Sequence, residues 1–226
     1  MVQSLLGALN SLAQGPVSGQ VLSRYNDFKS FSAKGEEAWF SELCFCLMTA
    51  NSSAQMGLKV QDALGFGGFY NLSQKKLTKE LKALGYRFYN KRAEYIVEAR
   101  KHFGIKGKLV EIGLIASEGD GRVTASEIAM DRAKRAYLSE NVKGFGLKEA
   151  SHFLRNTGHD NCAILDRHII RLMYEHAMIT ETPKTITARN YFAIESVLDT
   201  FAEEAGLNHS ILDLYLWYMK TGKVLK

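Results

Sequence analysis

Apolar residues return at spacings of three and four along nearly the whole chain, which is the period of an amphipathic α-helix. No segment shows the apolar–polar alternation that is typical of a half-buried strand. The clearest helical stretches are residues 36–49, 75–84, 89–103, 126–138, 165–177, 191–205 and 211–221. We therefore expect an all-α fold of about ten helices joined by short connections.

Glycine and proline mark the places where these helices should stop. Breaks are predicted at Gly15-Pro16, at 65–68, at 119–121, at 144–146 and at Thr182-Pro183. The glycines at 65–68 follow no strand and precede no Lys-Ser/Thr pair, so they indicate a tight turn between helices rather than a nucleotide-binding loop. With 226 residues and no internal repeat or linker, the chain can form one domain or two small lobes that share a core.

Several classes of protein are excluded by composition. The cysteines Cys44, Cys46 and Cys162 lack metal-type CxxC spacing, so we expect reduced thiols rather than disulfides or a four-cysteine metal site, with Cys44 and Cys46 buried. The six histidines form no HExxH motif, and no metal site is predicted. The longest apolar stretch, 43–48, is far shorter than the ~20 residues of a membrane-spanning helix. Residues 1–16 carry no secretory signal, and we expect an intracellular protein that does not contact a membrane.

Positive charge is concentrated in the middle of the chain. The net charge is +5, but residues 75–148 hold 17 Lys and Arg against 9 Asp and Glu, a balance of +8. The rest of the chain has a balance of −3. Such a surplus indicates either an ordinary solvated face or a surface for a polyanion.

The segment 142–173 contains the most informative residues. Gly144 and Gly146 permit a tight hairpin between a helix that ends near residue 140 and another that starts near 147. They also leave backbone N–H groups unobstructed, and such groups at a helix start suit a phosphate. A hairpin of this kind grips a duplex backbone without reading its sequence.

Lys148 lies on the first turn of the helix after this hairpin, one turn before His152 and on a different face from the apolar stripe. A lysine at this end of a helix dipole is disfavoured in its charged form, and a neutral amine is a nucleophile that can form a Schiff base. Asp166 follows an apolar run and opens another helix. A carboxylate beside an amine can stabilise a cationic sugar and accept a proton. The alternatives are a phosphate contact for Lys148 and a helix N-cap for Asp166.

The run Gly144-Phe145-Gly146-Leu147-Lys148, followed by Asp166, resembles the lysine-bearing, bifunctional helix-hairpin-helix DNA glycosylases. The segments 44–53, 85–100, 148–158 and 213–226 are similar to the archaeal type 8-oxoguanine DNA glycosylase/lyase, so the resemblance spreads over most of the chain. It implies a single unit over residues 1–226, built of two helical sub-lobes with the active site between them and the hairpin at about 138–158.

The resemblance also implies the reaction and its partner. The partner is double-stranded DNA that contains 8-oxoguanine, and the base must leave the stack because the sugar carbon C1′ is inaccessible within a duplex. Lys148 would attack C1′ and expel 8-oxoguanine, and the resulting Schiff base would allow β-elimination of the 3′ phosphate. Asp166 would be its electrostatic and proton-handling partner. The resemblance implies no cofactor. It implies only a structural monovalent cation, which the family hairpin often binds through main-chain carbonyls, here those of Glu140, Val142 and Phe145.

Further residues match positions at which the family holds the flipped base. Phe88 and Trp217 would sandwich it, with core packing as the alternative. Asp213, one turn before Trp217, would accept from the guanine N1–H and amino groups, with a surface salt bridge as the alternative. Lys226, the last residue, would help to close the base pocket through its carboxylate or its amine, whereas a frayed tail is the ordinary expectation. Asn51 would fill the vacated stack or contact the orphan base, with helix capping as the alternative.

Two other functions remain open on the sequence alone. One is a non-catalytic helix-hairpin-helix DNA-binding protein, and the other is a bifunctional glycosylase for oxidised pyrimidines. We expect a monomer that acts in the cytoplasm on the DNA of the nucleoid.

Overall fold

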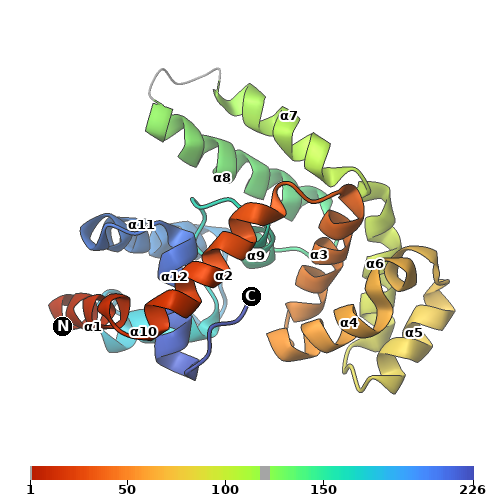
Figure 1. The fold of residues 1–226 in the computed structure, drawn as a ribbon, viewed down its shortest axis with the longest axis horizontal. Coiled ribbons are helices and arrows are strands. Elements are labelled where there is room, and N and C mark those ends of the chain that lie inside the picture. The colour runs from red at the N-terminus through yellow and green to blue at the C-terminus, as the bar shows by residue number, and fades with distance from the viewer. Residues whose placement is uncertain (1, 118–122) are drawn as a thin grey trace.

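Helices account for all the regular structure of the computed structural model, which describes residues 2–117 and 123–226 (Figure 1). These residues form twelve α-helices and one 3-10 helix, and no strand occurs among them. The all-α prediction is therefore confirmed. In chain order the helices are α1 (Val2–Gln14), α2 (Val17–Phe31), α3 (Glu36–Thr49), α4 (Ala54–Asn71), α5 (Gln74–Ala83), α6 (Tyr89–Ala99), η1 (Arg100–His102), α7 (Ile105–Ser117), α8 (Val123–Asn141), α9 (Leu147–Asn156), α10 (Arg167–Glu175), α11 (Ala188–Ala205) and α12 (His209–Thr221).

Most predicted breaks fall between observed helices. Gly15-Pro16 separates α1 from α2, and Pro183 lies between α10 and α11. At Gly65 the chain leaves helical geometry, with φ 56° and ψ −172°, so the helical run of α4 is kinked there. The predicted break at 119–121 lies outside the described residues.

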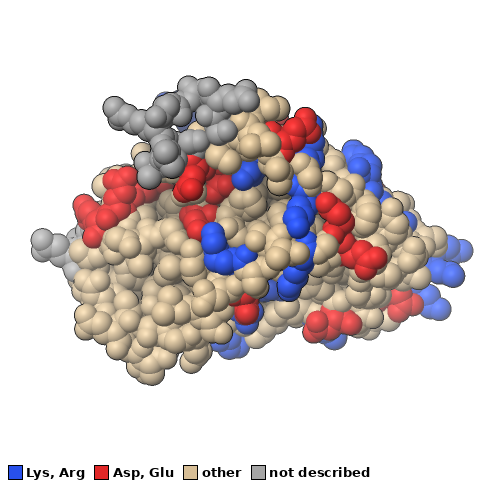
Figure 2. All heavy atoms as spheres, turned by 45° about the horizontal axis from the view of Figure 1, so that its top comes forward, with Lys and Arg blue, Asp and Glu red and all other residues tan. Residues whose placement is uncertain are grey.

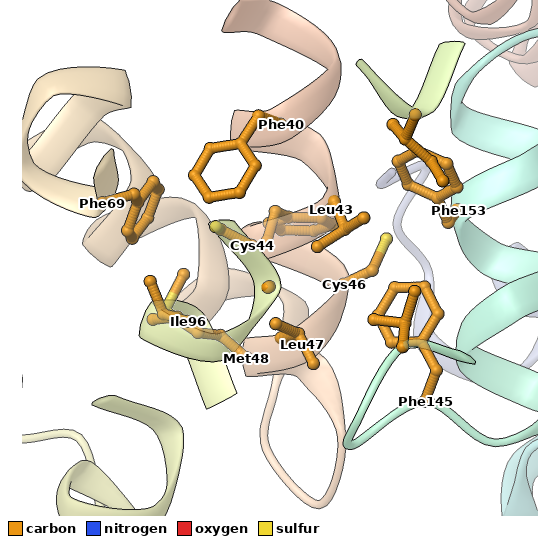
Figure 3. Packing of buried hydrophobic residues seen from close by; sticks show 14 of the residues in the cluster. Phe40, Leu43, Cys44, Cys46, Leu47, Met48, Phe69, Ile96, Phe145 and Phe153 are labelled. Atoms are coloured by element: carbon orange, nitrogen blue, oxygen red, sulfur yellow. The ribbon is translucent and has the colours of Figure 1, made fainter. Parts of the chain in front are cut away.

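The first lobe is built around α3, which is buried along most of its length (Figure 3). Residues 43–48 are fully buried, and apolar residues of α4–α9 pack on them. Cys44 lies on the side of Phe69, whereas Cys46 points toward the side of Phe153 (Figure 3). All three cysteines are free and buried, and the burial of Cys44 and Cys46 confirms the prediction for those two.

The second lobe has its own core, formed by residues of α1, α2, α10, α11 and α12. Helix α9 lies between the two cores, because Phe153 and Leu154 belong to the first core and Leu147 packs against the second. In Figure 1 the C-terminus lies between α12 and the first lobe. Across the described residues, no helix combines the length and the apolar character that crossing a membrane would require.

Candidate active site

A hairpin of five residues joins α8 to α9. The N–H of Phe145 donates to the Val142 carbonyl at 3.0 Å, which closes the turn. Gly144 has φ 95°, and a Cβ at this position would lie 2.5 Å from a ring carbon of Tyr95. Both the backbone conformation and the close approach therefore require glycine.

Gly146 is the N-cap of α9, and its backbone is extended. Its N–H donates to Oε2 of Glu149 at 3.2 Å. The expectation that the glycines leave the hairpin N–H groups unobstructed is thus wrong at this residue, because a carboxylate three residues later satisfies the donor. The second oxygen of Glu149 lies 3.6 Å from the Lys148 Nζ.

Lys148 lies on the first turn of α9, the part of this helix that keeps some exposure. Its exposed fraction is 25 %, whereas residues 150–156 of the same helix are buried. His152, one turn later, has a buried Nδ1 without a hydrogen-bond partner. Burial first, and then the cations Arg155 and Lys148, hold the pKa of His152 well below its usual value. One face of α9 therefore carries both the partly exposed amine of Lys148 and the neutral imidazole of His152.

Asp166 is the N-cap of α10, as the simplest interpretation of its position predicts. Its Oδ1 accepts from the backbone N–H groups of His168 at 2.8 Å and of Ile169 at 2.9 Å. Both capping bonds use the same oxygen. Capping therefore fixes the orientation of the carboxylate while it engages one of its two oxygens.

The charges of both predicted catalytic residues, Lys148 and Asp166, act on the carboxyl of Asp213. Burial raises the pKa of Asp213, Arg155 opposes this effect, the charge of Asp166 raises it further and that of Lys148 lowers it. Both residues thus act electrostatically on the same side chain. Asp213 forms a largely buried ion pair with Arg155, so the surface salt bridge that we considered is in fact an internal one.

Lys226 is anchored rather than frayed. Its Nζ donates to Oε2 of Glu42 at 2.7 Å and to Oε1 of Gln61 at 2.8 Å. The same nitrogen lies 4.3 Å from the centre of the Phe45 ring. These three partners belong to α3 and α4 of the first lobe, so the last residue of the chain crosses from the second lobe to the first.

The two predicted stacking residues come from different lobes. Trp217 lies on α12 and contacts the ring of His168 edge to face, with 5.2 Å between ring centres. Phe88 precedes α6, packs in part on the first core and lies under the guanidinium of Arg87. Both rings are partly exposed, which leaves surface for a ligand.

Asn51 lies at the tip of the turn between α3 and α4, and it is exposed. Its φ of 58° is uncommon for a residue other than glycine, although asparagine tolerates it better than most. Ser53, not Asn51, is the N-cap of α4, through a bond from the N–H of Met56. Asn51, Phe88 and Gly144 line one hollow of about 380 Å³.

Charge on the surface is only partly segregated. Figure 2 shows Lys and Arg side chains in a strip down the middle of one face, with Asp and Glu on both sides. Part of the basic surplus is neutralised locally, because Lys143 pairs with Glu98 at 2.8 Å and Lys108 pairs with Glu111 at 2.9 Å. In the described part of the chain, His, Cys, Asp and Glu side chains form no group that could hold a metal ion.

Sequence reasoning missed three polar residues of this region. Glu42 is buried in α3, and its Oε1 accepts from Asn156 at 2.7 Å. Asn156 in turn accepts from Arg155 at 2.9 Å. The available signal was a carboxylate inside the run 39–49, where apolar residues predominate and burial without a partner is unfavourable.

A family model and sequence relatives identify what this chain is similar to. The family model described as 8-oxoguanine DNA glycosylase matches residues 21–207. The 8-oxoguanine DNA glycosylase/AP lyase of Methanocaldococcus jannaschii is 45% identical over 222 residues, which cover 98% of this chain and 99% of that protein. The protein of the same description from Thermotoga maritima is 42% identical over 207 residues, 91% of each chain.

Solved structures agree with these sequence relatives. The M. jannaschii 8-oxoguanine glycosylase/lyase has a crystal structure in complex with a 15mer DNA containing 8-oxoguanine. It superposes with a TM-score of 0.85 and 43% identity, and the match covers 99% of this chain and 100% of that one.

Proposed function

Because the chain belongs to the 8-oxoguanine DNA glycosylase family, we propose that its reaction runs through Lys148 and Asp166. The protein is an 8-oxoguanine DNA glycosylase/AP lyase that acts on DNA containing 8-oxoguanine. The observation that carries the residue assignment is the position of Lys148, a partly exposed amine on the first turn of α9, together with the Asp166 carboxylate that is held by two capping bonds at the start of α10.

Lys148 is the nucleophile. Its neutral amine attacks C1′ of the damaged nucleotide, the glycosidic bond breaks, and 8-oxoguanine leaves with the bonding electrons and takes up a proton. Opening of the sugar ring then gives a Schiff base between Nζ and C1′. Loss of a proton from C2′ expels the 3′ phosphate by β-elimination, which cleaves the strand.

Asp166 stabilises the positively charged sugar and accepts the proton that the attacking amine releases. Its Oδ1 is engaged by two backbone N–H groups, so Oδ2 is the oxygen assigned to this work. Capping keeps the carboxylate oriented before the DNA arrives, and preorganised charge needs no rearrangement during the reaction. General acid–base help of this kind typically contributes about 10²–10⁴-fold to the rate.

The extruded base is held between the lobes. We assign stacking to Phe88 and Trp217, whose aromatic faces are each worth roughly 1–3 kcal/mol per stacked base. We assign hydrogen bonding to Asp213, which keeps a second carboxylate oxygen beside its bond to Arg155, and to Lys226. The supporting observation is that these residues come from separate helices and from both lobes.

The duplex is held by the hairpin glycines, Gly144 and Gly146, and by Asn51. A phosphate at Gly146 would compete with the Glu149 carboxylate for the N–H at the start of α9. Asn51 is suited to enter the duplex because it is exposed at the tip of a turn. That turn is held in place by Arg92, which donates to the Ala50 carbonyl at 2.6 Å. We propose that the protein acts on genomic DNA in the cytoplasm, at the nucleoid.

A monovalent cation is also proposed at the hairpin. The carbonyl of Val142 accepts one hydrogen bond, from Phe145, and retains a second lone pair, and the negative end of the α8 dipole lies at the same place. These features fit an ion held by the carbonyls of Glu140, Val142 and Phe145. When bound, the ion would supply positive charge close to a DNA phosphate.

Trapping with borohydride tests the assignment, because this reagent reduces a Schiff base to a stable bond. On duplex that contains 8-oxoguanine, we expect a covalent protein–DNA adduct with the parent protein and none with Lys148→Gln. Lys108→Gln, which alters an exposed lysine of α7, is the matched control and should trap normally. An adduct that persists in Lys148→Gln would refute the assignment. Neither alternative raised by the sequence is favoured by the relatives, which are described as acting on 8-oxoguanine.

A further inference from the structure

Glu42 is a carboxylate buried inside the first core. Its side chain is 1 % exposed, and it lies on α3 among fully buried apolar neighbours. Three nitrogens surround it: Asn156 Nδ2 at 2.7 Å, Lys226 Nζ at 2.7 Å and Gln61 Nε2 at 3.5 Å. Lys226 is its one ion-pair partner among the described residues. A buried carboxylate is therefore neutralised by the last residue of the chain.

A buried ion pair of this kind contributes little to the free energy of unfolding. Removing two charges from water is unfavourable by about as much as their mutual attraction regains, and apolar residues of similar volume would stabilise the core at least as well. The pair does, however, fix geometry. The 2.7 Å bond to Glu42, the 2.8 Å bond to Gln61 and the contact with the Phe45 ring together define the position of the ammonium group.

The anchored residue stands at the end of a short tail. Helix α12 ends at Thr221, and the cap Gly222 has a left-handed φ of 67°. The remaining residues, 223–226, are irregular in conformation and cross to the first lobe. Because these residues form no helix, the position of Lys226 depends on the contacts of its side chain, of which the bond to Glu42 is the one ion pair among the described residues.

Glu42 also reaches a second residue of the base pocket. Its Oε1 binds Asn156, Asn156 accepts from Arg155 at 2.9 Å, and Arg155 pairs with Asp213. The polar chain therefore runs without interruption from Lys226 to Asp213 through Glu42. Hydrogen-bonded networks of this kind orient their members together because each group is held from two sides.

We propose that Glu42 is a positioning residue for base excision: it fixes Lys226 directly, and Asp213 through Asn156 and Arg155, on two sides of the space that receives the extruded base. The inference rests on the proposed function, in which Lys226 and Asp213 contact that base. Glu42 itself touches no substrate.

Comparing base excision with strand cleavage distinguishes a positioning role of Glu42 from a purely structural one. Excision of 8-oxoguanine needs the base pocket, whereas strand cleavage at a preformed abasic site needs Lys148 and Asp166 but has no base to hold. Misplacement of a binding group by about 1 Å can lower a rate by roughly 100-fold. We therefore expect Glu42→Gln to lower kcat/KM for 8-oxoguanine excision by about 10- to 100-fold and to leave lyase activity on abasic duplex within about twofold.

Glu42→Gln is measured beside three variants, each with a urea unfolding curve to show that it is folded. Lys226→Met removes the anchored amine, the double variant combines both changes, and Glu111→Gln breaks an exposed Lys–Glu pair on α7 as the matched control. If Glu42 acts through Lys226, the double variant should excise about as well as the poorer single variant, because the two losses are not independent. Glu111→Gln should leave both activities unchanged.

Several outcomes would overturn the proposal. Normal excision by Glu42→Gln, or equal losses of excision and of lyase activity, would mean that Glu42 has no positioning role for the base. Normal excision by Lys226→Met would refute the assignment of Lys226 on which the inference rests. An adduct that persists in Lys148→Gln would refute the proposed reaction itself, so the two failures are distinguishable.

Discussion

Gly144 offers a quantitative test of the hairpin, through its replacement by alanine. A left-handed φ such as its 95° raises the energy of a residue with a Cβ by roughly 1–2 kcal/mol. The new methyl group would lie 2.5 Å from Tyr95 and 3.1 Å from Leu47, and overpacking of this kind adds roughly 1–3 kcal/mol. Reduced freedom of the unfolded chain offsets about 0.4–1 kcal/mol. We therefore expect Gly144→Ala to lower the free energy of unfolding by about 1–5 kcal/mol, with a central value of about 3 kcal/mol.

Gly146→Ala is the matched control, two residues away in the same hairpin. Its backbone is extended, and a Cβ would approach only the flexible Glu149 carboxylate, at 3.3 Å. The loss of an N-cap glycine and the gain in the unfolded state nearly cancel, so the change should stay below about 1 kcal/mol. Urea unfolding measures both variants, and a loss of about 3 kcal/mol in Gly144→Ala should lower the midpoint by about 1 M. Equal effects of the two variants would refute the reasoning about φ and space.

Three further results are expected. Asp166→Asn should lower kcat by about 10²–10⁴-fold while stability and the Kd for DNA change little, because asparagine caps a helix as well as aspartate does; comparable losses of turnover and affinity would contradict the catalytic role. His152 remains neutral when buried, whereas the unfolded chain binds a proton below about pH 6.5. Its contribution to the free energy of unfolding is therefore lost as the pH falls, with a slope that approaches about 1.4 kcal/mol per pH unit well below pH 6.5. His152→Gln should remove this slope, which amounts to about 1 kcal/mol between pH 6.5 and 5.5; an unchanged slope would count against a buried neutral imidazole. Trp217→Ala should weaken binding of lesion-containing duplex relative to intact duplex by roughly 1–3 kcal/mol, as measured by fluorescence anisotropy, and an equal loss for both duplexes would argue against base stacking.

The sequence predicted the strongly periodic helices well and the glycine-rich ones poorly. Helix α3 has the predicted bounds, and α5, α11 and α12 differ from them by three residues or fewer at each end. Helices α1, α2, α4 and α7, by contrast, lay outside the predicted stretches. In α4 and α7 several glycines, which disfavour helix, interrupt the apolar pattern. Tertiary packing overrides this preference: a Cβ on Gly57 would lie 2.9 Å from the Phe45 ring, and one on Gly113 would lie 2.9 Å from Lys134. These glycines let neighbouring helices approach closely, which no single helical pattern reveals.

The site was predictable where its residues lie near one another in sequence. Lys148 follows directly from the hairpin that precedes it, and Asp166 begins the next helix along the chain. The bond between Glu42 and Lys226 joins residues 184 positions apart, and periodicity contains no information about such a pair. The role of Glu149 was missed for a different reason, because a capping carboxylate and a phosphate compete for the same N–H and the sequence does not say which is bound.

The amine that forms the covalent bond to DNA can be identified directly. The borohydride-reduced complex with duplex containing 8-oxoguanine can be digested, and mass spectrometry can then locate the modified residue. If Lys148 is the nucleophile, the sugar remnant is found on Lys148 alone. A remnant on Lys143, on Lys226 or on any other amine would contradict this assignment.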